Sequence, residues 1–458
     1  MFHERLRRSG MCCVVLAVTL SQAAAQTART TGWRGDGSGR FEQAQPPTQW
    51  SQKSDNILWT LDVGRGYSSP VLVGDSSAGT GRLFLLSEPS SLVCVDPADG
   101  KILWNQTAGY AEVFGEDETK RIVETQRKFA AERRAVREKY KELRKQDPES
   151  PQLEALKKKE KEIDVRRRAF EGKFPAEKRG GARNAAATVS CDGNRVFAVF
   201  GTGIVAAFDM TGERLWIKQV AAPQQNFGHS ASPVFADNKL IVHVEQLTAL
   251  DPATGKQYWQ AEVPAKFGTP LVVKIAGQDV IATPAGTLVV AADGRVLTQK
   301  KQFQMARNSP IVHDGVLYAH ESGAVKAFRL PKSLDLPFTL ELLWKSSGAR
   351  DQRIASAVYH DGLLYAAGRK GIIDVIDAKT GEMVYRKRVD IGELFSSPTM
   401  AGGLIFFGGK DGKTLVLRPG RTYDEVAVNA LERYSSTPLF AGRRVYLRTD
   451  RLLYCIGE

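Results

Sequence analysis

The chain has 458 residues, of which 42 % are apolar and 25 % charged, and these proportions exclude a disordered or fibrous protein. The length would accommodate two or three ordinary domains or one large closed unit. The formal net charge at pH 7 is +13, and most of the excess positive charge lies in residues 118–183. The basic character therefore belongs to one segment and not to the chain as a whole.

Residues 1–25 are predicted to be an export signal. Three arginines precede an apolar run at residues 11–20, and the alanines at 23–25 offer a cleavage site. The apolar run is too short to span a bilayer, which takes about 20 residues. No cysteine follows the cleavage site, so we expect a Sec-type signal without lipidation. A periplasmic or otherwise exported location makes nucleic acid an improbable partner.

After an N-terminal extension, residues 26–56, a phrase of about ten residues keeps returning. Its copies are Asp96–Trp104, Asp209–Trp216, Asp251–Trp259 and, with tyrosine in place of tryptophan, Asp377–Tyr385. The aspartate and glycine favour a tight turn, and the aromatic side chain can be buried between neighbouring units. Repetition at about 40 to 45 residues is typical of a β-propeller.

A second phrase, Ser-Pro or a variant of it, precedes these copies, and the two phrases together delimit eight units. The units cover residues 67–107, 184–220, 228–263, 268–302, 309–345, 356–389, 396–428 and 435–458. The eighth unit stops before its fourth strand, whereas Ile57–Gly64 has the Leu-Trp of a fourth strand and no unit before it. Pairing the two would close the ring and protect the strand edges.

The expected fold is therefore all-β: an eight-bladed β-propeller with four-stranded antiparallel blades, in which an N-terminal strand closes the last blade. Residues 57–111 would supply the closing strand and blade 1, and residues 184–458 would supply blades 2–8.

The repeat is interrupted at residues 112–183, where we predict an inserted basic helical hairpin. Apolar residues recur every seven positions in two stretches: Ile122, Phe129, Val136 and Leu143, then Leu156, Ile163 and Phe170. The prolines within residues 147–151 must end a helix. Two helices of roughly 25 and 20 residues would pack as a short antiparallel coiled coil, and Pro175–Gly181 would be a flexible return to the ring.

The charge of this hairpin has two interpretations. Lysine, arginine and glutamate alternate at three- and four-residue spacing, which is typical of a solvated helical face. The clusters Lys157–Lys159 and Arg166–Arg168 would also suit an acidic protein partner or an anionic membrane surface. Deleting Glu118 to Lys178 is predicted to leave a folded ring and to weaken partner binding.

Few residues suggest chemistry. Cys94, Cys191 and Cys455 are widely separated within apolar strands, which favours buried free thiols over disulfides. No histidine pair has the spacing of a metal site, and the Gly-x-Ser-x-Gly and Cys-x-x-Cys-His motifs are absent. His229 and Arg307, near the starts of units, are the candidates for an oxidoreductase site, although a structural role is the ordinary one for such a histidine. We assign no catalytic, cofactor-binding or metal-ligating residue.

The recurring phrase resembles the tryptophan-docking motif of the PQQ-binding-like (quinoprotein alcohol dehydrogenase-like) β-propellers, and the resemblance covers nearly the whole chain outside the insertion. One branch of that family binds pyrroloquinoline quinone (PQQ) and calcium. The other branch resembles the outer-membrane assembly factor BamB and serves as a docking scaffold. The adjacent cysteine pair of the first branch is missing outside the predicted signal, because the only such pair, Cys12-Cys13, lies within it. The lipidation cysteine of the second branch does not follow the predicted cleavage site. Trp33–Gly39 and Trp50–Trp59 resemble exported PQQ-like repeat proteins.

The sequence therefore favours an exported, non-enzymatic scaffold that binds a protein, in cell-envelope or outer-membrane protein organisation. We expect a monomer, a partner that contacts the basic helical arm, and no cofactor. The alternatives are a PQQ- or metal-dependent oxidoreductase and a carbohydrate-binding propeller.

Overall fold

The computed structural model describes residues 31–75, 79–176, 184–224, 228–298, 301–348 and 351–457. The predicted export signal lies outside these residues, as does most of the predicted flexible return after the hairpin. Among the described residues, no helix is long and apolar enough to cross a membrane.

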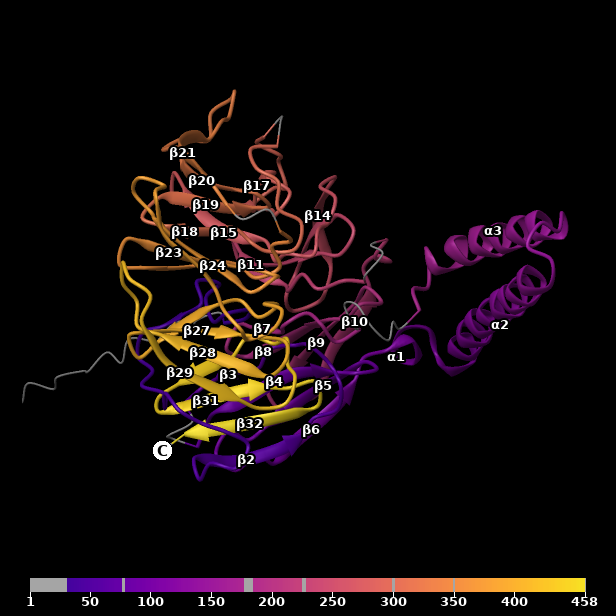
Figure 1. Cartoon of the computed structure of the whole chain (residues 1–458), viewed down its shortest axis with the longest axis horizontal. Helices are drawn as coiled ribbons and strands as arrows, with labels where there is room; N and C mark the ends of the chain where they lie inside the picture. The colour runs from indigo at the N-terminus through magenta and orange to yellow at the C-terminus, as the bar shows by residue number, and fades with distance from the viewer. Residues whose placement is uncertain are drawn as a thin grey trace, which may run out of the picture.

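The strands form eight separate sheets arranged as the blades of a propeller (Figure 1), so the predicted fold is confirmed. Within each blade, strands that follow one another in the sequence pair antiparallel, from the ring axis outward. The strands are short and separated by turns, as the alternation of apolar runs with Gly, Asp and Asn predicts. The second and third strands of the blades are largely buried, whereas the outermost strands are half-buried or exposed.

The strands of blades 1 to 4 have the following bounds. Blade 1 contains β3 (Val71–Val73), β4 (Arg82–Ser87), β5 (Ser91–Val95) and β6 (Ile102–Thr107). Blade 2 contains β7 (Ser190–Cys191), β8 (Arg195–Val199), β9 (Ile204–Asp209) and β10 (Arg214–Gln219). Blade 3 contains β11 (Val234–Ala236), β12 (Lys239–His243), β13 (Leu247–Leu250) and β14 (Gln257–Ala261). Blade 4 contains β15 (Leu271–Ile275), β16 (Gln278–Ala282) and β17 (Leu288–Val290).

Blades 5 to 8 continue in the same order. Blade 5 contains β18 (Ile311–His313), β19 (Val316–Glu321), β20 (Ala324–Arg329) and β21 (Glu341–Ser347). Blade 6 contains β22 (Val358–His360), β23 (Leu363–Gly368), β24 (Ile372–Asp377) and β25 (Met383–Arg388). Blade 7 contains β26 (Thr399–Ala401), β27 (Leu404–Gly408), β28 (Lys413–Leu417) and β29 (Glu425–Ala430). Blade 8 contains β30 (Leu439–Ala441), β31 (Arg444–Arg448), β32 (Leu452–Gly457) and β2 (Ile57–Asp62).

The ring closes through blade 8, as predicted. The N-terminal strand β2 pairs antiparallel with the C-terminal strand β32, with Trp59 opposite Cys455 and Leu61 opposite Leu453. The two ends of the ring are therefore held together by backbone hydrogen bonds.

Two blades depart from the expected four strands. In blade 4 the segment expected to form the fourth strand has lost its tryptophan, and it pairs with β17 only through an isolated bridge between Val289 and Val296. In blade 7 a fifth strand, β1 (Arg40–Phe41), pairs in parallel with β26 on its axial side. The sequence pattern of the N-terminal extension did not indicate this strand.

Residues 31–50, here called the N-terminal strap, cross the ring. The Thr31 N–H donates to the Cys191 carbonyl of blade 2 at 3.0 Å, and the Gln45 N–H donates to the Gly442 carbonyl of blade 8 at 2.7 Å. Between these points lies β1, which is the strand of blade 7 nearest the ring axis. The strap therefore ties blade 2 to blades 7 and 8, which do not adjoin it in the ring.

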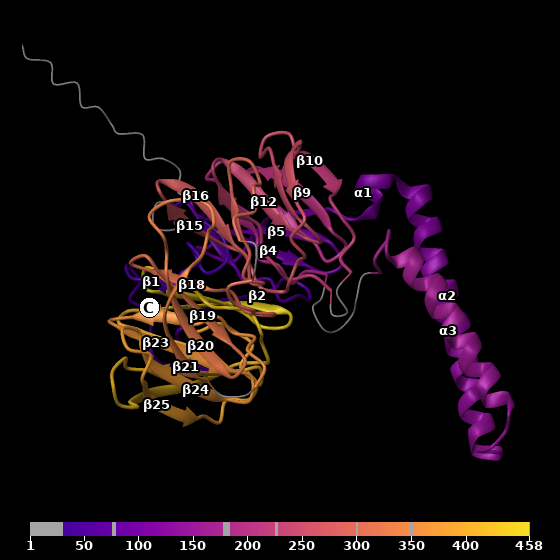
Figure 2. The same ribbon diagram turned by 90° about the horizontal axis from the view of Figure 1, so that it is seen from above.

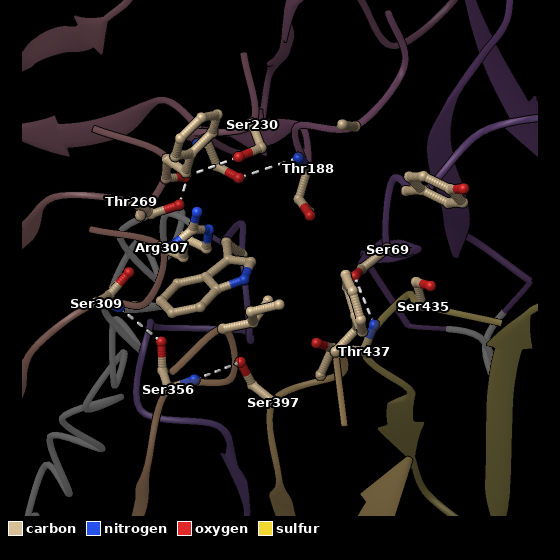
Figure 3. A pocket seen from close by; sticks show the side chains of 18 of the residues that line it. Ser69, Thr188, Ser230, Thr269, Arg307, Ser309, Ser356, Ser397, Ser435 and Thr437 are labelled. Carbon is tan, nitrogen blue, oxygen red and sulfur yellow. Dashed lines mark hydrogen bonds between the residues drawn. The ribbon is translucent and has the colours of Figure 1, made fainter. Parts of the chain in front are cut away.

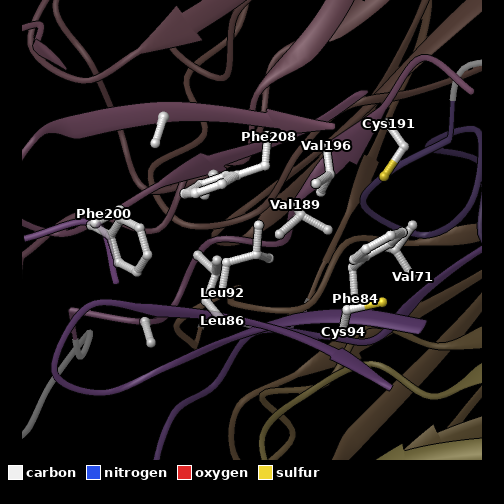
Figure 4. Packing of buried hydrophobic residues seen from close by; sticks show 14 residues of the cluster. Val71, Phe84, Leu86, Leu92, Cys94, Val189, Cys191, Val196, Phe200 and Phe208 are labelled. Atoms are coloured by element: carbon white, nitrogen blue, oxygen red, sulfur yellow. The ribbon is translucent and has the colours of Figure 1, made fainter. Parts of the chain in front are cut away.

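The recurring phrase forms the joint between blades. In five joints the indole N–H of one blade donates to a backbone carbonyl in the next blade's turn; the pairs are Trp59–Pro97, Trp104–Met210, Trp216–Pro252, Trp259–Ala291 and Trp344–Ala378. Apolar residues of adjoining blades fill the space between the sheets, as Figure 4 shows for blades 1 and 2. Cys94 and Cys191 are part of that cluster, and all three described cysteines are buried free thiols, as predicted.

The insertion consists of α1 (Tyr110–Phe114), α2 (Glu116–Gln146) and α3 (Gln152–Glu171). The two long helices lie side by side and project beyond the ring, as both views show (Figure 1, Figure 2). The predicted pair of helices is confirmed, but α2 has 31 residues, which is longer than expected, and α1 was not foreseen. Ile122, Val136 and Ile163 of the predicted apolar seam are buried.

Candidate functional site

A cavity of about 470 Å³ lies at the ring axis and is enclosed by all eight blades. Each blade contributes one hydroxyl residue, placed just before its innermost strand: Ser69, Thr188, Ser232, Thr269, Ser309, Ser356, Ser397 and Thr437. Most of these side chains surround the opening in Figure 3. We call this set the hydroxyl belt. In several blades the belt residue is the serine of the Ser-Pro phrase, so that phrase marks where the chain passes the cavity and enters the innermost strand.

Backbone groups of one blade bond to belt hydroxyls of the next. The N–H donors and hydroxyl acceptors are Thr188–Ser232 (3.0 Å), Ser232–Thr269 (3.0 Å), Ser309–Ser356 (2.8 Å), Ser356–Ser397 (3.0 Å) and Thr437–Ser69 (2.9 Å). A hydroxyl that accepts in this way still has its own proton to donate. The belt therefore offers O–H donors to whatever occupies the cavity.

Cations and aromatic rings lie nearer the mouth of the cavity. The Arg307 guanidinium lies 6.0 Å from the centre of the Phe267 ring, and the Lys410 ammonium lies 4.7 Å from the centre of the Phe395 ring. Arg369 also contacts Phe395, at 5.6 Å, and all five side chains line the cavity. Arg369 and Lys410 lie in loops between the second and third strands of blades 6 and 7, and we call the face that carries these loops the mouth face.

The N-terminal strap separates this cavity from a second one. Trp33 lines the first cavity, whereas strap residues 36, 38 and 40–44 line the second, which measures about 450 Å³. Arg34 is buried between them and donates to the carbonyls of Ala357 (3.0 Å) and Pro398 (2.8 Å). Burial lowers the pKa of Arg34 to about 9. The strap thus forms one end of the axial cavity.

The two residues singled out for an oxidoreductase site are not brought together. Arg307 lines the cavity, but His229 is only 3 % exposed and is not part of the lining. Burial lowers the pKa of His229 to about 4, so its imidazole is neutral at pH 7. Its position is that of a structural histidine.

The lining does not fit a calcium-bound quinone. Calcium takes six to eight oxygen ligands, usually with carboxylates among them. Among the described residues, the polar side chains of the lining are hydroxyls, cations and one glutamine, without a carboxylate, and the remaining side chains are aromatic or aliphatic. Within the same residues, no group of three His, Cys, Asp or Glu side chains could hold a metal ion.

Sequence reasoning missed Arg369, Lys410 and the two phenylalanines. The two cations occupy the same loop position in consecutive blades, Gly368-Arg369-Lys370 and Gly409-Lys410-Asp411, where blade 2 has Phe200-Gly201-Thr202. Aligning these loops would have revealed the charge. Nothing in the repeat shows that Phe267 and Phe395 lie beside those cations.

Two solved structures are similar to the chain at low sequence identity. The structure of BamB from Moraxella catarrhalis is 17 % identical, with a TM-score of 0.48 over 58 % of this chain and 80 % of that chain. The quinohemoprotein alcohol dehydrogenase from Comamonas testosteroni is 11 % identical, with a TM-score of 0.52 over 89 % of this chain and 78 % of that chain.

No curated protein matches the sequence significantly. A family model does match, over residues 48–138, 149–333 and 339–449. The first gap in this match, residues 139–148, contains the end of α2 and the start of the connection to α3. The matched residues include strands from every blade of the ring, and the chain belongs to the PQQ-like propeller family described as outer membrane protein assembly factor BamB.

Proposed function

We propose that this protein is an exported, non-enzymatic scaffold that binds a protein partner through its mouth face and its helical arm, in the organisation of envelope proteins. The observation that carries the proposal is the anchored basic arm, which stands beside a cavity suited to binding. The family description, an assembly factor, supports the same class of function.

The base of the arm is an aromatic cluster that packs against Ile204 of the ring. Phe174 packs against Tyr110, Phe114 and Phe170, with ring centres 5.4 to 6.2 Å apart. The Gln126 side chain donates to the Phe174 carbonyl at 2.9 Å. Because these contacts fix the base of the arm, the helices hold a defined direction, and ordering them costs little when a partner binds.

Contacts with blade 2 place that base on the mouth face. The Gln219 amide donates both to the Lys173 carbonyl of the arm and to the Thr202 carbonyl, at 3.1 and 3.0 Å. Thr202 lies in the blade 2 loop that corresponds to the loops of Arg369 and Lys410. After the arm, the chain leads into Ala186 and Thr188, which line the cavity. One partner could therefore contact the arm and the mouth together.

The charge of the arm favours an acidic partner. Acidic residues on each helix pair with arginines of the other, including Glu160 with Arg137 and Glu132 with Arg166. Several cations make no ion pair within the described residues and lie toward the far end of the arm: Lys139, Lys141, Arg144, Lys145, Lys158 and Lys159. At about 1.5 Å per residue, α2 carries this positive charge tens of ångströms from the ring.

The test shortens the arm without disturbing its base. Deleting Glu118 to Lys178 would also remove Ile122 and Phe170, which pack against Ile204 of the ring, so the smaller cut is preferable. Replacing residues 131–168 with a short glycine-serine linker retains those contacts. We expect unchanged thermal unfolding and loss of the partners that the intact protein cross-links in envelope extract. A second variant, with Lys139, Lys141, Lys158 and Lys159 changed to glutamine, should lose the same partners.

Two results would contradict the proposal. One is capture of the same partners by the intact and the shortened protein. The other is dye-reducing activity that appears when PQQ and calcium are added to the purified protein, which would favour the oxidoreductase alternative.

A further inference from the structure

We propose that the axial cavity binds the carboxylate of an anionic ligand, with Arg307 and Lys410 pairing to its charge and Ser309 donating a hydrogen bond. The site is separate from the arm and does not depend on what the arm binds.

Ser309 is the first observation. Its side chain is buried, with 3 % exposure of the residue, and its Oγ makes no hydrogen bond within the described part of the chain. The hydroxyls of the neighbouring blade residues Ser356 and Ser397 each accept a backbone N–H, whereas that of Ser309 does not. A buried hydroxyl without a partner costs free energy, and an acceptor atom of a ligand would remove that cost.

The balance of charge is the second observation. Three cations line the cavity. Of the carboxylates beside it, Glu393 is engaged by Arg369 through contacts of 2.6 and 2.7 Å, and Asp351 is paired with the buried Arg353. Lys410 is 3.5 Å from the Glu393 carboxylate. Arg307 has no ion pair within the described residues, and its guanidinium lies over a neutral ring, Phe267. An enclosed site with this surplus attracts an anion.

The remaining lining residues indicate the ligand class. The belt hydroxyls whose oxygens accept a backbone N–H have protons left to donate, so the wall favours a ligand rich in acceptor oxygens. Phe267, Phe395 and Trp33 add flat apolar surface to the same cavity. A volume of about 470 Å³ lies within the range of small-ligand sites. A carboxylate attached to an apolar body matches these features better than a fully polar sugar does.

Such a carboxylate could come from a free small molecule or from the acidic end of a peptide that enters through the mouth. 3-Phenylpropionate, which carries one carboxylate on an apolar body, and an acetylated peptide of alternating glutamate and phenylalanine are suitable probes for the two sources. Each would be titrated into the full-length protein by isothermal calorimetry, at low and at high salt.

We expect saturable binding of at least one probe, weakened by salt. Arg307→Gln should weaken it about tenfold or more, because a charged hydrogen bond is lost. Lys410→Gln should weaken it less, since Lys410 is already near Glu393. Ser309→Ala should weaken it without lowering the unfolding temperature. Arg214→Gln is the matched control, because Arg214 is exposed on β10 and outside the cavity lining.

Binding of 3-phenylpropionate alone would identify a small carboxylate as the ligand, and binding of the peptide alone would identify an acidic segment. The proposal is overturned if neither probe binds, or if Arg307→Gln binds as tightly as the Arg214→Gln control. The shortened-arm protein retains the whole cavity, so it should bind the probes as the intact chain does. Probe binding by the cavity and partner binding by the arm are therefore tested independently, and either proposal can fail without the other.

Discussion

At the scale of single residues, the hydroxyl belt shows that one residue type can have two roles. Ser356 and Ser309 occupy equivalent positions in neighbouring blades and line the same cavity. The Ser356 hydroxyl accepts the Ser309 N–H at 2.8 Å and so joins two blades, whereas the Ser309 hydroxyl has no partner in the described part of the chain. The sequence does not distinguish them, because both belong to the same repeated phrase.

Alanine substitutions should separate these roles. Ser356→Ala leaves the buried Ser309 N–H without an acceptor, so we expect the free energy of unfolding to fall by about 1–3 kcal/mol. Ser309→Ala removes a hydroxyl that makes no hydrogen bond and should change stability by less than about 0.5 kcal/mol. Urea denaturation of both variants measures the difference, and equal losses would contradict the assignment.

At the scale of elements, the joint between blades needs glycine for two reasons. Gly255 has φ +70°, which side-chain-bearing residues adopt at a cost, and a Cβ there would lie 2.7 Å from the indole of Trp216. The same close approach recurs for Gly212 with Trp104 and for Gly381 with Trp344. The turn of one blade is thus the platform on which the tryptophan of the preceding blade rests.

Gly255→Ala should therefore cost more than backbone strain alone. Gly277 is the matched control, because it has φ +77° and open space where its Cβ would be. We expect Gly277→Ala to lower the free energy of unfolding by about 1–2 kcal/mol. Gly255→Ala should lower it by about 3 kcal/mol or more, since Trp216 must move out of its groove. Denaturation curves and the near-ultraviolet circular dichroism of tryptophan would report both effects; similar values for the two variants would contradict the packing argument.

At the scale of the whole molecule, three buried histidines link stability to pH. Burial lowers the pKa of His229 and His243 to about 4 and that of His320 well below its usual value. Above about pH 6.5 these imidazoles are neutral in both the folded and the unfolded chain, so they add no pH dependence. Below that pH the unfolded chain takes up protons that the folded chain does not, and the folded state loses stability.

We therefore expect the unfolding temperature to fall as the pH drops from about 6.5 toward 4. Each histidine can contribute up to about 1.4 kcal/mol per pH unit in that window. His320→Leu removes one of these titrating groups and should therefore reduce the pH dependence of the unfolding temperature. The substitution loses no hydrogen bond, because neither ring nitrogen of His320 has a partner among the described residues. His313→Leu, at a half-buried site, is the control. An unchanged slope in His320→Leu would contradict the role of His320.

The sequence by itself determined the number of blades, the tryptophan joints, the divided eighth blade and the site of the helical insertion. These features follow from local turn chemistry and hydrophobic spacing, repeated often enough to be counted. The sequence also predicted the apolar seam of the hairpin, because the seven-residue spacing places Ile122 and Val136 on one face of α2 and Ile163 on one face of α3.

Only the tertiary structure decided which side chains meet at the ring axis. Arg307, Arg369 and Lys410 come from three blades and approach one another only once the ring is closed. The strap was hidden for the same reason, since Arg34 bonds to carbonyls more than 300 positions away. Local patterns specify turns and strands, whereas the cavity depends on contacts between distant segments, which a repeated phrase does not encode.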